Sequence, residues 1–131
     1  MRVLFCGDRN WTAYKVIADV MADLNPDVVI EGEARGADLM ASDAAEYFGI
    51  PVVRFPADWE KYGRAAGPIR NTQMLKEGKP DIVVAFHNNI KDSKGTLNMV
   101  NQARKQNIKV IVYTEQGLQT IYQANEGFFW I

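Results

Sequence analysis

The sequence predicts an α/β protein built on an open parallel sheet of about five strands, with helices on both faces. Five short runs rich in Val, Ile and Phe recur along the 131 residues, and they are continuous rather than alternating. Such runs are typical of parallel strands that are covered on both faces. Segments with a helical spacing of apolar residues separate the runs. This repeated order of strand and helix favours a single sheet with right-handed crossovers.

The expected elements alternate along the chain and form one domain over residues 1–131. The five strands are expected at residues 3–6, 28–30, 52–55, 82–86 and 110–113. Helices are expected at residues 14–24, 37–48 and 96–106, and stops that contain Asn-Pro or Gly and Pro precede the second, third and fourth strands. The connection over residues 56–75 is longer than a plain crossover, so it predicts a loop followed by a helix over residues 69–75.

Composition bounds the classes of function. The formal net charge is −1, and this argues against a nucleic-acid interface, which usually needs a clustered basic excess. The single cysteine, Cys6, cannot form an internal disulfide, and no apolar run approaches the roughly 18 to 20 residues that span a bilayer. The first residues also lack the features of a secretory signal. We therefore expect a cytoplasmic protein without a membrane segment, and we expect neither a metal nor a cofactor.

Ligands of open parallel sheets collect at the carboxyl ends of the strands, where the strand order reverses. The segments that leave the first, second and fourth strands are enriched in glycine or small polar residues, whereas the opposite ends carry mainly proline-containing stops. These segments cover residues 7–11, 31–38 and 87–96. The asymmetry predicts a binding site at one edge of the sheet.

The turn after the second strand has two glycines, Gly32 and Gly36, which permit tight backbone conformations and leave room for a ligand. The N-terminus of the next helix attracts anions, and Arg35 adds a positive charge. In the alternative interpretation, the glycines only shape the turn, Arg35 is solvated and Asp38 stabilises the helix start. The spacing matches neither the dinucleotide fingerprint nor the P-loop.

Two further stretches strengthen the prediction of an anion site. Arg70, followed by Asn71, offers the forked donors that suit phosphate, although a surface salt bridge is the alternative. Upstream, Trp59 stacks on a base or packs against the core edge. The stretch from Lys94 through Gly95 to Thr96 precedes a helix, so it presents donors to a ligand, or Thr96 is a simple helix cap. His87, the only histidine, is expected to have a structural role.

Taken together, these residues resemble the YspA-like branch of the SLOG superfamily over about residues 2–114. That superfamily also contains the LOG phosphoribohydrolases and the Rossmann-like part of DprA. The resemblance implies a Rossmann-like fold, a nucleotide or nucleotide-derived ligand, and an origin in bacteria or phages, where such proteins have been proposed as ligand sensors. The implied ligand-binding residues are Gly7, Asp8, Arg9, Gly32, Arg35, Gly36, Asp38, Arg70, Asn71, Lys94, Gly95 and Thr96.

The sequence departs from the LOG enzymes at the position of their catalytic glutamate, where Met99 stands. A thioether cannot act as a carboxylate in acid-base chemistry, so that mechanism does not carry over. The leading hypothesis is therefore a nucleotide-binding sensor or sequestering module. The alternative is a hydrolase or transferase at an N-glycosidic bond, for which Asp8 or Glu31 is a weak catalytic candidate. A DNA-binding role by analogy with DprA is disfavoured by the net charge.

The last residues of the chain are unusually apolar. The stretch EGFFWI, residues 126–131, ends in four consecutive large apolar side chains, which a frayed terminus would expose to water. They either fold back onto the domain or contact a partner, and we expect a homo-oligomer.

Overall fold

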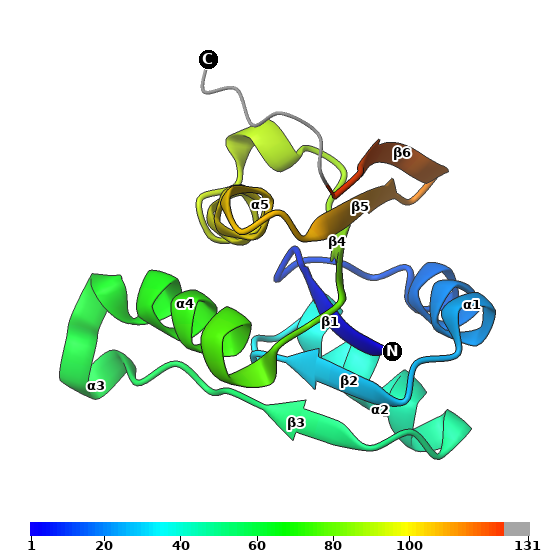
Figure 1. Cartoon of the computed structure of the whole chain (residues 1–131), viewed down its shortest axis with the longest axis horizontal. Coiled ribbons are helices and arrows are strands. Elements are labelled where there is room, and N and C mark those ends of the chain that lie inside the picture. Colours follow the sequence, from blue (N-terminus) through cyan, green and yellow to red (C-terminus); the bar gives the residue numbers. More distant parts are fainter. Residues whose placement is uncertain (125–131) are drawn as a thin grey trace.

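The computed structural model describes residues 1–124, which form a six-stranded sheet in the order β3-β2-β1-β4-β5-β6 (Figure 1). The expected C-terminal contact segment, residues 126–131, lies outside the described residues. Strands β1 to β5 are parallel, and β6 runs antiparallel to β5. Their bounds are β1 Arg2–Gly7, β2 Val28–Glu31, β3 Val52–Arg54, β4 Ile82–Phe86, β5 Lys109–Thr114 and β6 Gly117–Tyr122.

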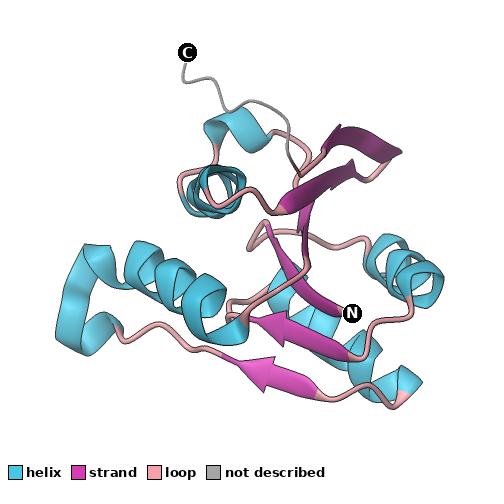
Figure 2. Cartoon of the chain, in the orientation of Figure 1, coloured by secondary structure: helices cyan, strands magenta, loops and turns pink. Residues whose placement is uncertain are grey.

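The helices cover both faces of this sheet (Figure 2), so the predicted α/β class and Rossmann-like arrangement are confirmed. No helix among residues 1–124 is long and apolar enough to cross a membrane. The helices are α1 Tyr14–Leu24, α2 Ala37–Phe48, α3 Trp59–Tyr62, α4 Ala66–Gly78 and α5 Gly95–Lys105, with the 3₁₀ turns η1 Gly63–Ala65 and η2 Ile90–Asp92.

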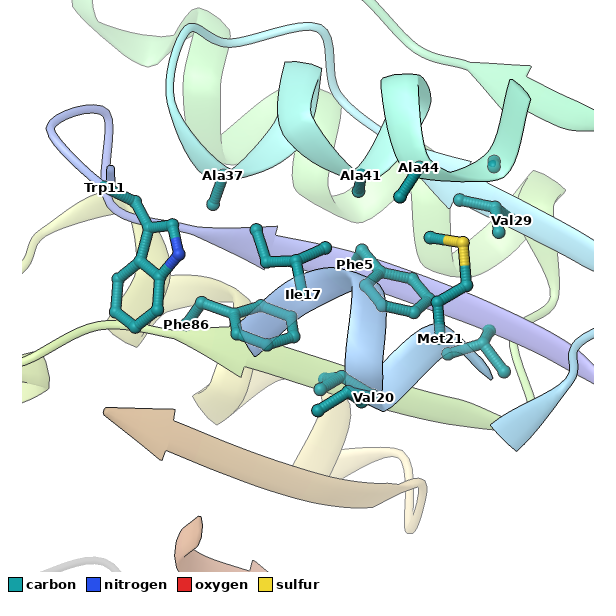
Figure 3. Packing of buried hydrophobic residues seen from close by; sticks show 13 residues of the cluster. Phe5, Trp11, Ile17, Val20, Met21, Val29, Ala37, Ala41, Ala44 and Phe86 are labelled. Carbon is teal, nitrogen blue, oxygen red and sulfur yellow. The ribbon is translucent and has the colours of Figure 1, made fainter. Parts of the chain in front are cut away.

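Alternation along the strands divides the core into two clusters. Val3 and Phe5 face α1 and α2, whereas the neighbouring Leu4 and Cys6 face α4 and α5. On the first face, small alanines of α2 lie against the sheet beside Phe5 and Phe86 (Figure 3). The rings of Phe5 and Phe86 are stacked with centroids 5.9 Å apart. Because both faces are covered, the central strands appear in the sequence as continuous apolar runs.

Several parts of the fold differ from the prediction, including a short helix, α3, in the stretch that was expected to be a loop. Strand β6 was not expected, because its residues Gly117–Tyr122 (GLQTIY) contain no continuous apolar run. Helix α4 begins at Ala66 rather than at residue 69, so it includes Gly67 and Pro68. Proline is tolerated in the first helical turn, where its missing N–H would have no helical partner. The predicted bounds of α1 and α2 match the structure.

Candidate functional site

A cavity of about 540 Å³ opens at the carboxyl edge of the sheet, between the ends of β1 and β4. The chain runs from β1 towards β2 and β3 on one side, and from β4 towards β5 on the other, so the strand order reverses here. Open α/β sheets bind their ligands at such a switch point. The loops after β1, β2 and β4 all line this cavity, as do the first turns of α4 and α5.

The lining of the cavity is cationic although the whole chain has a net charge of −1. Five cationic side chains line it, against two carboxylates, Asp8 and Asp38. Low-dielectric walls of one charge sign concentrate counter-ions, so this cavity favours an anionic ligand. The five cations are Arg9, Arg35, Arg64, Arg70 and Lys94.

Most of the residues that the sequence predicted for the site come together in this cavity. Gly32 instead lines an adjoining cavity of about 360 Å³, which shares Arg9, Arg35 and Arg70 with the first. Gly36 and Glu31 line neither cavity. The predicted residues in the main cavity are Gly7, Asp8, Arg9, Arg35, Asp38, Arg70, Asn71, Lys94, Gly95 and Thr96.

The start of α2 contacts protein backbone where a ligand was expected. Gly36 has φ +79°, and a Cβ there would lie 2.4 Å from the carbonyl oxygen of Asp8. The N–H of Ala37 donates to that same oxygen at 3.1 Å. The absence of a side chain at Gly36 therefore leaves room for the loop after β1. This contact fits the alternative interpretation, in which the glycine shapes the turn.

Asp38, in the first turn of α2, is a buried carboxylate that stabilises the same turn. Its Oδ2 accepts a hydrogen bond from the N–H of Ala34 at 3.2 Å, across four residues. Burial raises the pKa of Asp38 to about 6, and the Arg70 guanidinium opposes that rise. Asp38 thus holds the turn and faces the charge of Arg70.

Arg70 and Asn71 link the turn after β2 to the start of α5. The Nη1 of Arg70 donates to the carbonyl oxygen of Gly32 at 2.6 Å, and its Nε donates to the Asn71 side chain at 3.1 Å. Asn71 in turn donates to the carbonyl oxygen of Gly95 at 3.2 Å. Arg70 Nη2 has no hydrogen bond to any residue from 1 to 124, so it is free to meet a ligand.

The first turn of α5 lines the cavity with Gly95 and Thr96. The Oγ of Ser93, which the sequence reasoning did not single out, accepts the Thr96 N–H at 3.0 Å and is the side chain that caps this end. A Cβ on Gly95 would meet no heavy atom within 4 Å. Nothing within the described chain therefore requires glycine at this position, which lines the cavity.

Glu31 does not lie where the weak catalytic hypothesis needs it. The side chain is fully buried, its Oε1 accepts the N–H of Glu33, and its Oε2 lies 3.8 Å from Arg54 Nε with no hydrogen-bond partner among the described residues. Burial raises the pKa of Glu31 to about 7. Glu31 is therefore buried beside Arg54 and lines neither of the two cavities.

Asp8, the other catalytic candidate, does line the cavity, and it lies beside His87. Asp8 Oδ2 is 3.8 Å from His87 Nε2. Sequence reasoning left His87 out of the site, although its place directly after β4, at the same edge as Asp8, was the signal that could have found it. Arg64 was not predicted for the site either. It lies in the connection between β3 and α4 and lines the cavity.

Trp59 and Met99 contribute apolar surface to the walls of the main cavity. Trp59 is 47% exposed, and the Arg9 guanidinium lies 5.4 Å from its ring centre. Trp59 and Arg9 each line both cavities. Met99, almost fully buried, contributes an apolar surface to the main cavity. An exposed indole at the rim of a cationic cavity offers a flat surface on which a base can stack.

Three similarities to known proteins agree with this geometry. A model of the YspA, cpYpsA-related SLOG family matches residues 1–62. The Gene 61 protein of Mycobacterium phage D29 is 35% identical over 125 residues, which cover 88% of this chain and 98% of that protein. The structure of DNA processing protein A (DprA) from Streptococcus pneumoniae superposes with a TM-score of 0.69 at 17% identity. That match covers 86% of this chain and 49% of the DprA chain, so this chain spans about half of DprA.

Proposed function

The chain belongs to the YspA, cpYpsA-related SLOG family, and on that premise we propose that its cavity binds a nucleotide or nucleotide-derived ligand, as a sensor or sequestering module. The observation that carries the proposal is the cluster of five cationic side chains around one cavity in a chain of net charge −1. Phosphate is the anion that guanidinium and helix N-termini bind together. The cavity volume of about 540 Å³ is in the range of small-molecule sites.

The cations differ in how far they are already engaged within the protein. Arg70 donates hydrogen bonds from two of its nitrogens to Gly32 and Asn71, and Arg35 donates to the side chain of Asn10 at 3.3 Å. The side chains of Arg64 and Lys94 have no hydrogen bond or ion pair with any of residues 1–124. Arg64 and Lys94 are therefore the cations whose removal tests ligand binding with the least effect on the fold.

Arg64→Ala and Lys94→Ala are each expected to weaken binding of the best ligand roughly tenfold, because each removes a charge-assisted contact of about 1.4 kcal/mol. A thermal-shift screen of nucleoside mono-, di- and triphosphates finds the ligand, and isothermal titration calorimetry measures its affinity. Lys76→Ala is the matched control, since Lys76 is exposed on α4 and lines neither cavity. Equal affinities in the wild type and all three variants would contradict the proposed site.

The same ligand is expected to be recovered intact. Met99 offers no group that exchanges a proton, and Asp8 and Asp38 are the only carboxylates that line the main cavity within the described chain. After incubation at equal concentrations and denaturation, chromatography should return the ligand without free base or sugar phosphate. Release of base over many turnovers that is lost in Asp8→Asn would instead establish the alternative, cleavage or transfer at the N-glycosidic bond.

A further inference from the structure

Asp8 and His87 form a pair within the cavity whose hydrogen-bonding capacity is incompletely used. Asp8 follows β1 and His87 follows β4, so the two side chains come from the adjacent central strands. Oδ2 of Asp8 and Nε2 of His87 lie 3.8 Å apart, which exceeds a hydrogen bond. Neither atom has another hydrogen-bond partner among residues 1–124. Both side chains are partly accessible and line the cavity.

Hydrogen bonds from nearby backbone N–H groups determine that His87 Nε2 is a donor and that Asp8 Oδ2 is an acceptor. His87 Nδ1 accepts the N–H of Asn89 at 2.9 Å, so the proton of the neutral ring is on Nε2, and this nitrogen is a donor. Asp8 Oδ1 accepts the N–H of Asn10 at 2.9 Å, which orients the carboxylate and leaves Oδ2 as an acceptor. The cavity therefore presents one donor and one acceptor side by side, in a lining where cations outnumber carboxylates.

A hydroxyl is the group that satisfies both atoms at once, because it accepts from Nε2–H and donates to Oδ2. An ionised phosphate oxygen has no proton to donate to Asp8, and the carboxylate repels its negative charge. We propose, resting on the proposed function, that Asp8 and His87 recognise a sugar hydroxyl of the ligand. The ligand class is then a ribose phosphate ester with its hydroxyls free, in preference to inorganic phosphate or a deoxygenated nucleotide.

The test compares the four ribonucleoside 5′-monophosphates with their 2′,3′-dideoxy counterparts by isothermal titration calorimetry. The wild-type protein is expected to bind the best ribonucleotide roughly tenfold more tightly than its dideoxy partner, since one hydrogen bond to a charged group is lost. In Asp8→Ala and in His87→Phe this ratio should fall towards one, because the dideoxy compound has no hydroxyl for either side chain to contact. Asp43→Ala, an exposed carboxylate of α2 outside both cavities, should retain the tenfold ratio.

The outcomes separate this inference from the proposed function. If the wild type binds neither series, the proposed nucleotide-binding function is wrong, and the hydroxyl contact, which rests on it, is wrong as well. If both series bind equally, or if the preference persists in Asp8→Ala and His87→Phe, the nucleotide site stands and the hydroxyl contact is overturned. The two variants change different loops, so a folding defect in one, detected by circular dichroism, leaves the other to decide.

Discussion

Gly36→Ala is expected to lower the free energy of unfolding by about 3 kcal/mol or more, a large loss for a domain of this size. The residue has φ +79°, which L residues rarely adopt, and the new Cβ would lie 2.4 Å and 2.5 Å from the carbonyl oxygens of Asp8 and Arg9. Both obstacles are backbone atoms of the loop that holds the start of α2, so they cannot move aside cheaply. Urea denaturation followed by circular dichroism measures the loss.

The matched control is Gly95→Ala, at another glycine that the sequence placed beside a ligand. Its Cβ would meet no atom within 4 Å, and alanine favours the helix that begins there. We expect its urea midpoint to equal or exceed that of the wild type. The larger Gly95→Leu should fold equally well but bind the ligand of the thermal-shift screen at least tenfold more weakly. A stable Gly36→Ala protein would show that the loop after β1 is not pressed against this turn.

The second large effect is a loss of stability as the pH rises from about 4.5 to about 7. Burial raises the pKa of Glu31 from 4.5 to about 7, so in this interval the folded protein keeps a proton that the unfolded chain releases. The contribution is fully present below pH 4.5 and is lost as the pH passes the folded pKa, in total about 3 kcal/mol. The raised pKa of Asp38 acts in the same direction up to about pH 6.

Urea denaturation at pH 6.5, 7.0 and 7.5 reports mainly on Glu31, because Asp38, whose folded pKa is about 6, is mostly ionised in this interval. Glu31→Gln is expected to flatten the decline across this interval, since the amide cannot ionise. Glu46→Gln, an exposed carboxylate on α2, should keep the wild-type slope. A wild-type protein whose stability does not fall between pH 6.5 and 7.5 would contradict the burial of a Glu31 carboxylate whose Oε2 accepts no hydrogen bond within the described chain.

The sequence alone predicted those parts of the fold whose signals are local. Apolar spacing with a following Asn25 or Gly49 determined α1 and α2 to the residue, because both end in a left-handed residue that stops the helix. The buried strands were equally visible as continuous apolar runs. Strand β6 has no such run, since Gln119 and Thr120 interrupt its apolar residues and none of its six residues is fully buried. For that reason it was missed.

The position of the site followed from topology, whereas the roles of its residues did not. A chain that alternates strand and helix brings the carboxyl ends of its strands to one edge, so the glycine and basic residues after β1, β2 and β4 were predicted together without coordinates. Only the tertiary structure decided which of them face the cavity. Gly36 meets the backbone of Asp8, Glu31 turns into the core, and His87 stands beside Asp8. Each of these contacts joins segments far apart in the chain or depends on the direction of one side chain at a strand end. Such contacts produce no periodic pattern of residues, so the sequence alone does not predict them.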